Sequence, residues 1–383
     1  MKKIIYILIV LVAIVLLWVL LSMVGLQYIL VAILAFGFLI AVHELGHFTA
    51  AKLLKVKVNE FAIGMGPKVL KKQGKETLYT LRALPLGGFC AMGEDDGETD
   101  DPRAFTSQKR WRRVVILAAG AAANFISAFI IIILLTTSFN LFMGTTITNL
   151  IDDFPNQGVN GIMVGDTMVS INGEKLYYQD DFLLFMGLAE HRGNKEVDLV
   201  IRRDGETIKL NNFPLQRREY IIDGKPDVKF GITFNRIEAT AIEKLKYSCF
   251  VAFYNVRLVR VSLAQLISGA AGINDMSGIV GIVDAMNDIG QASPTVVDAL
   301  LNIASFTALI GVNLAIMNML PIPALDGGRI LFVFISWFIE KVIRRRVDPK
   351  YEGYIHTAAF VLLIGLMIFI LVNDVVKIIG KTG

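Results

Sequence analysis

The chain has 383 residues, of which 54% are hydrophobic and 19% are charged, and its mean hydropathy is +0.58. The apolar share exceeds the roughly 45–50% found in soluble domains, so several membrane spans and one extramembrane domain are expected. A formal net charge of only +4 argues against nucleic acid as a partner. Cys90 and Cys249 lie far apart in unrelated contexts, so no disulfide framework is predicted.

Five apolar runs are long enough to cross a bilayer as helices, which takes about 20 residues. The first covers residues 4–24 and is interpreted as a signal anchor or true span, because its apolar core is too long for a cleaved signal peptide and no A-x-A site follows it. One long tilted helix joining the first two runs is the alternative. The other four runs are 28 to about 51, 114 to about 137, about 300 to 326, and 357–372.

Basic clusters predict the orientation of these spans through the positive-inside rule. Lys2 and Lys3, the lysines within 52–57, and the basic residues within 109–113 and 341–350 all fall on the cytoplasmic side in one arrangement. The segment from about 144 to 293 then lies outside.

The segment between the second and third runs contains β structure. Residues 56–64 and 77–92 alternate polar and apolar side chains, which predicts strands. Glycine and proline at 64–67 and 85–88 are typical of turns. An open strand edge beside a membrane site can pair with an extended substrate, and a solvated hairpin is the alternative. The acidic run 94–101 lacks the spacing of a calcium loop and is interpreted as a solvated charge run.

Residues 145–233 have the composition of a soluble β-rich domain. A strand pattern over 161–173 ends in Asn172-Gly173, and Asp204-Gly205 joins strands at 197–203 and 207–210. This pattern resembles a PDZ domain, in which a groove between a strand and a helix captures a peptide, and any small β-rich domain is the alternative. Residues 240–268 predict an amphipathic helix at the outer surface rather than a span, and a Gly-rich connector follows at 269–281.

The second run carries His43-Glu44-Leu45-Gly46-His47, an HExxH motif. Two imidazoles four residues apart lie on one face of a helix, and the glutamate beside them is placed to act on water. If Lys52 marks the cytoplasmic boundary, nine helical residues place His43 roughly 14 Å inside it. The sequence therefore predicts a zinc site within the bilayer.

A catalytic zinc needs a third protein ligand. A metzincin would supply histidine six residues beyond the second histidine, but position 53 is leucine. Ionisable residues within membrane spans are functional candidates by default, and Asp326 ends a long uncharged stretch. Pro321 and Pro323 break the helix just before it, and broken helices at membrane depth line cavities or are buried in protein. Asp326 is therefore the candidate third ligand.

The HExxH motif and Asn318-x-x-Pro-x-Pro-x-Leu-Asp-Gly327 together resemble the site-2 protease family of intramembrane zinc metalloproteases, especially bacterial members that carry a PDZ domain. The resemblance extends from about residue 28 to the end and includes Gly120-x-x-x-Asn124-Phe125. It implies an α-helical polytopic membrane protein with four to five transmembrane helices, a membrane-associated β-hairpin element and an inserted extracytoplasmic PDZ-like domain.

The resemblance also implies roles for individual residues. His43, His47 and Asp326 would be zinc ligands, Glu44 would be the general base, and Asn318 would contact the substrate backbone or the developing oxyanion. The corresponding domains are an extra N-terminal span (1–25), a first catalytic membrane half (26–142), a PDZ-like domain (143–236), an amphipathic helix with connector (237–298) and a second catalytic half (299–383).

The function expected from this resemblance is an intramembrane zinc endopeptidase of a bacterial inner or plasma membrane. Its partners would be the lipid bilayer and transmembrane substrates, such as anti-sigma factors or remnant signal peptides. A membrane PDZ adaptor with a decayed protease site is one alternative, although the four residues of the zinc site are intact. A metal transporter is another, but the glutamate of HExxH would have no task in a transporter.

Overall fold

A computed structural model describes residues 12, 16–20, 22, 25–92, 101–222, 225–272, 276–344 and 349–382. The chain divides into two compact units, one formed by Met1–Leu135 with Asn255–Gly383 and the other by Thr136–Tyr254. Most of the predicted first span, and residues 94–100 of the acidic run, lie outside the described residues.

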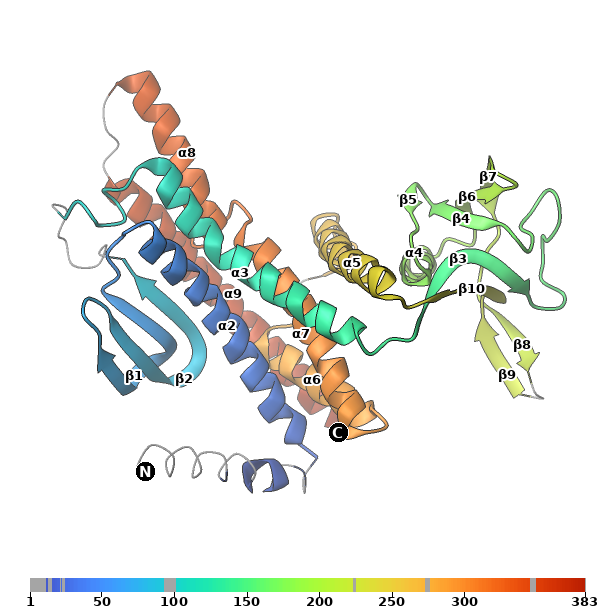
Figure 1. Cartoon of the computed structure of the whole chain (residues 1–383), viewed down its shortest axis with the longest axis horizontal. Helices are drawn as coiled ribbons and strands as arrows, with labels where there is room; N and C mark the ends of the chain where they lie inside the picture. Colours follow the sequence, from blue (N-terminus) through green and yellow to red (C-terminus); the bar gives the residue numbers. More distant parts are fainter. Residues whose placement is uncertain are drawn as a thin grey trace. The chain divides into compact units, whose positions relative to one another are not determined.

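The first unit is a helical bundle with a small sheet (Figure 1). Its helices coincide with the apolar runs at 28–51, 114–137, 300–326 and 357–372, although α9 extends well beyond its run. Two further helices, α6 and α8, follow the Gly-rich connector and the proline-containing segment, and the sequence analysis did not predict them. The helices are α2 (Gln27–Leu53), α3 (Arg110–Thr136), α6 (Ile279–Ala292), α7 (Val296–Asn318), α8 (Asp326–Ile343) and α9 (Pro349–Thr382).

Among the described residues, five helices are long and apolar enough to cross a membrane: α2, α3, α7, Gly353–Gly380 of α9, and α5 (Ala241–Ile267). These helices identify a multi-pass membrane protein. Helix α5 confirms the helix predicted at 240–268. Its length and composition would allow it to span, so its predicted position at the outer surface stays a prediction.

Helix α2 packs closely against α3, α6 and α7. One face of α2, including Tyr28 and Leu39, packs against α6 and α7 in a core that also contains Met286 and Ile303. On another face, Gly46 lies so close to α3 that a methyl group there would overlap the backbone of Ala119. Small residues allow such close helix crossings in membranes.

The strands of the first unit are β1 (Glu60–Gln73) and β2 (Leu78–Ala91), which pair with each other. Residues 60–63 pair in parallel with 78–81 and in antiparallel with 88–91, whereas 68–73 pair in antiparallel with 78–82. Both strands therefore double back at the predicted turn residues, where Gly64, Gly66 and Gly87 have φ of +87°, +84° and +81°. Residues 88–91 form one edge of this sheet and 68–73 the other.

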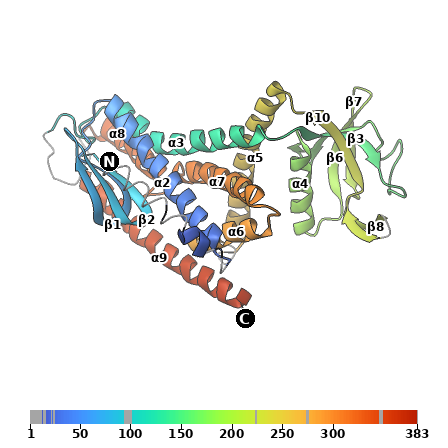
Figure 2. The same ribbon diagram turned by 60° about the horizontal axis from the view of Figure 1, so that its bottom comes forward.

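The second unit contains a sheet with strand order β10-β3-β4-β6-β7, in which β5 also pairs with β4. Helix α4 (Gln179–His191) lies beside this sheet (Figure 2). It contributes Phe182 and Met186 to the core of the unit. The predicted turns are confirmed, since both residues of Asn172-Gly173 and of Asp204-Gly205 have positive φ. The sheet strands are β3 (Leu141–Leu150), β4 (Thr167–Ile171), β5 (Glu174–Lys175), β6 (Val197–Arg203), β7 (Glu206–Phe213) and β10 (Ile232–Glu238), and a separate hairpin joins β8 (Arg218–Ile222) to β9 (Lys225–Lys229).

Candidate metal centre

Helix α2 places both histidines of the HExxH motif on its face toward α3. Most side chains of this helix are apolar. Apart from the two histidines, its ionisable residues are Tyr28, Glu44 and Lys52. His47 is 8% exposed and His43 is 15% exposed. The two rings meet edge to face with centroids 4.7 Å apart, as the i, i+4 spacing on a helix dictates.

Asp326 reaches the same point because the chain breaks between α7 and α8. Helix α7 ends at Asn318, prolines follow at 321 and 323, and α8 begins at Asp326 itself. The first turn of α8 packs tightly on this connection, since a methyl group on Gly327 or Gly328 would overlap backbone carbonyl groups of residues 319–322. This packing fixes the direction in which the Asp326 carboxylate points.

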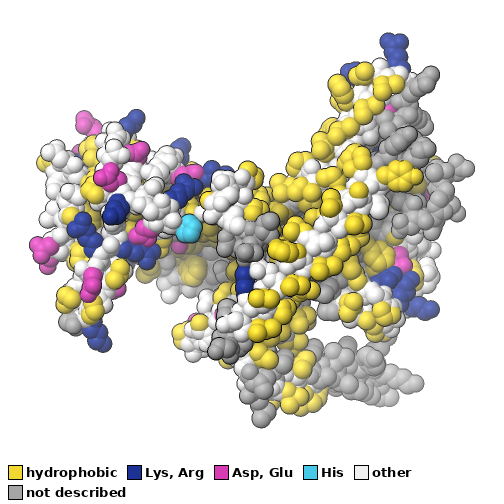
Figure 3. Space-filling view, turned by 180° about the vertical axis from the view of Figure 1, so that it is seen from behind, with side chains coloured by type: hydrophobic (Ala, Val, Ile, Leu, Met, Phe, Trp, Pro, Cys, Tyr) yellow, Lys and Arg dark blue, Asp and Glu magenta, His cyan; other side chains and the backbone are white. Residues whose placement is uncertain are grey.

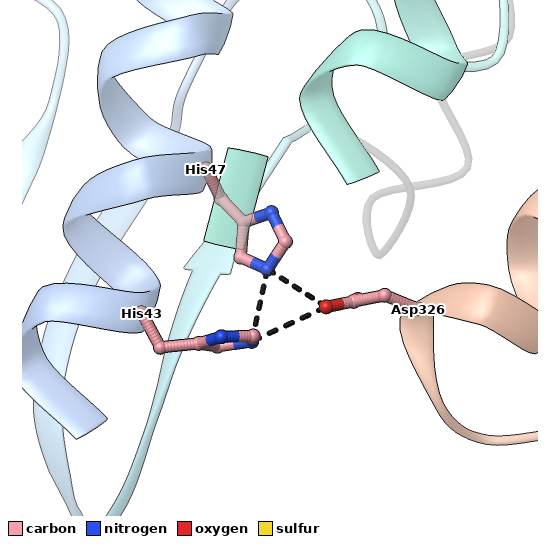
Figure 4. A group of neighbouring side chains, drawn as sticks. All are labelled: His43, His47 and Asp326. Atoms are coloured by element: carbon pink, nitrogen blue, oxygen red, sulfur yellow. Dashed lines mark hydrogen bonds and ion pairs between the residues drawn. The ribbon is translucent and has the colours of Figure 1, made fainter. Parts of the chain in front are cut away.

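The three side chains form a nearly equilateral triangle of ligand atoms (Figure 4). The His43 and His47 Nε2 atoms are 3.1 Å apart, and Asp326 Oδ2 lies 3.2 Å from each of them. Tetrahedral zinc ligands at bond lengths of 2.0–2.1 Å lie about 3.3 Å apart. The triangle therefore has the dimensions of three ligands of one zinc ion.

The chemistry of the donor atoms also fits a cation. The His47 Nδ1 atom lies 2.8 Å from the carbonyl oxygen of Ile116 on α3. If Nδ1–H donates to that oxygen, Nε2 of the neutral ring presents its lone pair to the centre. Asp326 Oδ2 is buried and accepts no hydrogen bond. Buried acceptors that converge without donors are costly, and a metal ion at their centre satisfies all three.

The walls of the centre come from α3 and β2, and both carry glycine at the point of contact. A methyl group on Gly120 of α3 would lie 2.6 Å from His47 Cε1 and 2.7 Å from His43 Cε1. A methyl group on Gly88 of β2 would lie 2.8 Å from Glu44 Cγ. The sheet edge formed by residues 88–91 therefore begins beside Glu44.

Asn318, expected at the scissile segment, lies beside a metal-binding histidine. Its Nδ2 atom is 3.5 Å from His43 Nδ1, and amide oxygen and nitrogen atoms are interchangeable in such assignments. If Nε2 of a neutral His43 ring presents its lone pair to the centre, Nδ1 carries the proton, and it can donate to Asn318 only if the amide group is turned over so that its oxygen faces Nδ1. Asn318 thus has a contact that orients His43, and its contact with a substrate stays a prediction.

The structure brings together all five residues that the sequence indicated: His43, Glu44, His47, Asn318 and Asp326. Sequence reasoning did not identify the Ile116 carbonyl or the glycines at 88 and 120 as parts of the centre. The run of small residues at 118–123 was a signal of close helix packing. A backbone carbonyl group that orients a histidine leaves no signal in the sequence.

Comparison with known proteins agrees with this geometry and defines the class as zinc metalloproteases. Residues 31–366 match the model of peptidase family M50, and the chain belongs to this family. A Clostridium acetobutylicum relative whose name places it among zinc metalloproteases is 38% identical over 352 residues, which cover 91% of this chain and 97% of the relative. The zinc metalloprotease RasP of Geobacillus kaustophilus is 26% identical over 431 residues, covering 92% and 98%.

A third relative, the regulator of sigma-W protease RasP of Bacillus subtilis, is 25% identical over 428 residues, covering 90% of this chain and 97% of the relative. The chain is thus a zinc metalloprotease with several membrane-spanning helices.

Proposed function

We propose that this protein is an intramembrane endopeptidase that hydrolyses peptide bonds within the transmembrane segments of other proteins. The observation that carries the proposal is the position of the ligand triangle, two corners of which lie on α2 within a membrane span. A zinc ion held by these residues would supply an acidified water, with a pKa lowered towards about 7, where bulk water is scarce.

In this proposal, each side chain of the metal centre has a separate role. His43, His47 and Asp326 hold the ion, and the Ile116 carbonyl keeps the His47 ring in one orientation. Glu44, next to His43 in the sequence and packed against Gly88, takes a proton from water and later gives it to the leaving amine. Asn318 fixes His43 and, as a further part of the proposal, contacts the substrate backbone.

We propose that the sheet edge at residues 88–91 binds the substrate as an added strand. A transmembrane helix protects its peptide bonds with internal hydrogen bonds, so the segment to be cut must first unwind. Among the described residues, 88–91 pair with 60–63, and the Ala91 carbonyl oxygen also accepts from the N–H of Asn59, just before the same neighbouring strand. In the part of the chain that the structure describes, the other side of this edge strand has no strand partner. An unwound segment that adds to this side gains backbone hydrogen bonds next to Glu44.

The second unit supports a role outside the membrane. We propose that residues 143–236 form a PDZ-like domain. Strand β10 is at the edge of its sheet, beside β3, and α4 packs on the core of the same unit. An extended peptide can add to such an edge strand. The domain would dock or size-select substrates whose outer parts have already been trimmed.

The substrates we propose are membrane-anchored proteins with a single span, such as anti-sigma factors or remnant signal peptides, in a bacterial inner or plasma membrane. The name of the Bacillus subtilis relative, regulator of sigma-W protease, supports the first of these classes. The orientation predicted from the basic clusters puts the second unit on the outer side of the membrane and His43 roughly 14 Å from the cytoplasmic boundary at Lys52.

Cleavage in a defined membrane tests this proposal. Purified protein in liposomes, supplied with a single-span model peptide, should cut within the span of the peptide. Glu44→Gln should lower the rate of cleavage at least about a hundredfold, because it removes the general base. A zinc-loaded wild-type protein that binds the peptide and leaves every span intact would contradict the proposal and favour the adaptor alternative.

A further inference from the structure

Helix α8 has an apolar face that nothing in the described structure covers. Five large apolar residues repeat at i, i+3, i+4, i+7 and i+11 along this face, and each is 37–64% exposed. They form a continuous stripe along α8, part of the yellow surface that ends at the dark blue tip in Figure 3. The stripe, called here the α8 stripe, consists of Leu331, Phe334, Ile335, Phe338 and Val342.

The opposite face of α8 is the one that contacts the protein, and it carries the polar groups. Val333 is 3% exposed, and Glu340 forms an ion pair with Arg110 at the start of α3. In a soluble protein an amphipathic helix places its apolar face inward. Here the arrangement is reversed, so the medium around the α8 stripe is apolar.

The end of α8 is cationic. Lys341 lies over the ring of Trp337 at 5.4 Å, and Arg344 ends the helix with a left-handed φ of +57°. The sequence continues with Arg345 and Arg346. Helix α8 is not among the helices of the described residues that could cross a membrane. Because α8 begins at Asp326 in the metal centre, an apolar stripe followed by a tryptophan and a cationic end is the pattern of a helix whose C-terminal end reaches the headgroup region.

From these observations we infer that α8 is a docking surface for anionic phospholipids of the cytoplasmic leaflet. The α8 stripe enters the acyl region, and Lys341 and Arg344 bind the anionic headgroups. Basic residues near an anionic leaflet are attracted to it electrostatically, which identifies lipid as the occupant. Because α8 begins at Asp326, these lipids also hold the helix that carries the proposed third zinc ligand.

Quenching of Trp337 fluorescence tests this inference directly. The chain has three tryptophans, so Trp18→Phe with Trp111→Phe leaves Trp337 as the only one. The protein is reconstituted in phosphatidylcholine with phosphatidylglycerol as the minor lipid, and either lipid carries brominated acyl chains at equal mole fraction. Brominated phosphatidylglycerol should quench Trp337 at least about twofold more strongly than brominated phosphatidylcholine.

Two double variants decide the role of the cationic end. Lys341→Gln with Arg344→Gln should reduce this preference to near equality, whereas Lys195→Gln with Lys209→Gln, which removes two exposed cations of the second unit, should leave it unchanged. Equal quenching by the two lipids in the parent protein would overturn the inference. Weak quenching by both would also overturn it, because the stripe would then be covered by water or by a second copy of the chain. The measurement needs no substrate, so it is independent of the proposed proteolysis.

Discussion

The groups that surround the ligand triangle are small or belong to the backbone. Gly120 and Gly88 form its walls, and the Ile116 carbonyl oxygen lies 2.8 Å from His47 Nδ1. A side chain at either glycine would displace a histidine ring or Glu44. The geometry of the centre therefore depends as much on missing side chains as on the ligands themselves.

The ligand assignment predicts the zinc content of single variants. Wild-type protein should hold about one zinc per chain, and His43→Ala, His47→Ala and Asp326→Ala should each lose most of it, because two ligands bind zinc far more weakly than three. Glu44→Gln should keep the metal. Atomic absorption of the purified proteins measures this, with His191→Ala, an exposed histidine at the end of α4, as control. Near-stoichiometric zinc in Asp326→Ala would remove this residue from the ligand set.

Gly120→Ala should weaken zinc binding although it changes no ligand. The new methyl group would lie within 2.7 Å of carbon atoms of both histidine rings, so both rings would have to shift away from α3. We expect affinity for zinc to fall at least about tenfold, as for changes in groups that orient ligands. Competition with a chelator measures the affinity. Gly37→Ala on α2, where a methyl group meets nothing within 4 Å, is the matched control and should bind zinc normally.

At the scale of elements, the sequence predicted best what depends on local pattern. Uninterrupted apolar runs predicted the helices that cross the membrane, and Asn-Gly and Asp-Gly pairs predicted two tight turns. The bends of β1 and β2 within one sheet were only partly predicted, because pairing of 60–63 with two different segments is a non-local choice. Helices α6 and α8 were missed. Their sequences are interrupted by glycine or charge, and tertiary contacts decide that they are helical.

Helix α6 depends on one such contact. Asp374 of α9 is 2% exposed, and its Oδ2 accepts hydrogen bonds from the backbone N–H groups of Gly278 and Gly281 at 2.9 and 2.8 Å. These donors belong to the N-terminus of α6, where a carboxylate is favourable. Asp374 therefore tethers α6 to α9.

Asp374→Ala should destabilise the protein without removing zinc. The substitution leaves two backbone donors without a partner, which costs about 1–3 kcal/mol. We expect a lower midpoint of thermal unfolding in detergent and an unchanged zinc content at low temperature. Asp227→Ala removes a carboxylate that is 56% exposed and should leave the midpoint where it is. An unchanged midpoint in Asp374→Ala would show that the tether contributes nothing.

The sheet edge gives a prediction about catalysis. In an antiparallel pair, neighbouring residues direct their N–H groups alternately to the partner strand and away from it. Of the adjacent residues Phe89 and Cys90, one therefore points its N–H group to the open side, and proline at that position (Phe89→Pro or Cys90→Pro) removes this donor. That variant should cleave a transmembrane substrate at least about tenfold more slowly at unchanged zinc content, because proline cannot donate to an added strand. Leu78 and Leu81 are unsuitable positions, since both already pair with residues on two sides.

Proline at the opposite edge is the control for this experiment. Lys71→Pro and Lys72→Pro alter the strand segment at 68–73, which pairs with 78–82 on the far side of the sheet. Both should retain cleavage. If all four variants cleave normally while folded and metal-loaded, the sheet is a solvated hairpin rather than a substrate platform.

At the scale of the whole molecule, contacts inside the bundle are consistent with the predicted orientation. On α3, Ile116 lies beside His47, whereas Ala128 and Leu39 both lie beside Gly311 of α7. Helices α2 and α3 therefore run in opposite directions. If α2 runs inward to Lys52, α3 runs outward, and the chain that follows it emerges on the outer side.

Thiol labelling tests this orientation. In a protein whose two cysteines are replaced by alanine, Asn194→Cys should react with a membrane-impermeant maleimide in intact cells, because residue 194 is exposed in the second unit. Lys109→Cys, exposed just before α3, should react only after the cells are opened. The reverse pattern would overturn the orientation. Burial raises the pKa of Cys90 to about 12, so this thiol adds little background even where it is retained.

The separation of the two histidines from Asp326 along the chain sets the order in which the centre is made. At about 5–20 residues per second of synthesis, the roughly 280 residues between them take about 15–55 s to appear. Throughout that interval, the helix with the HExxH motif exists without its proposed third ligand, while the whole second unit is produced. A nascent or stalled chain that ends before residue 326 thus carries only part of the machinery. The complete set of proposed zinc ligands therefore exists only after residue 326 has been translated, and membrane proteins cannot be cleaved by this chain before then.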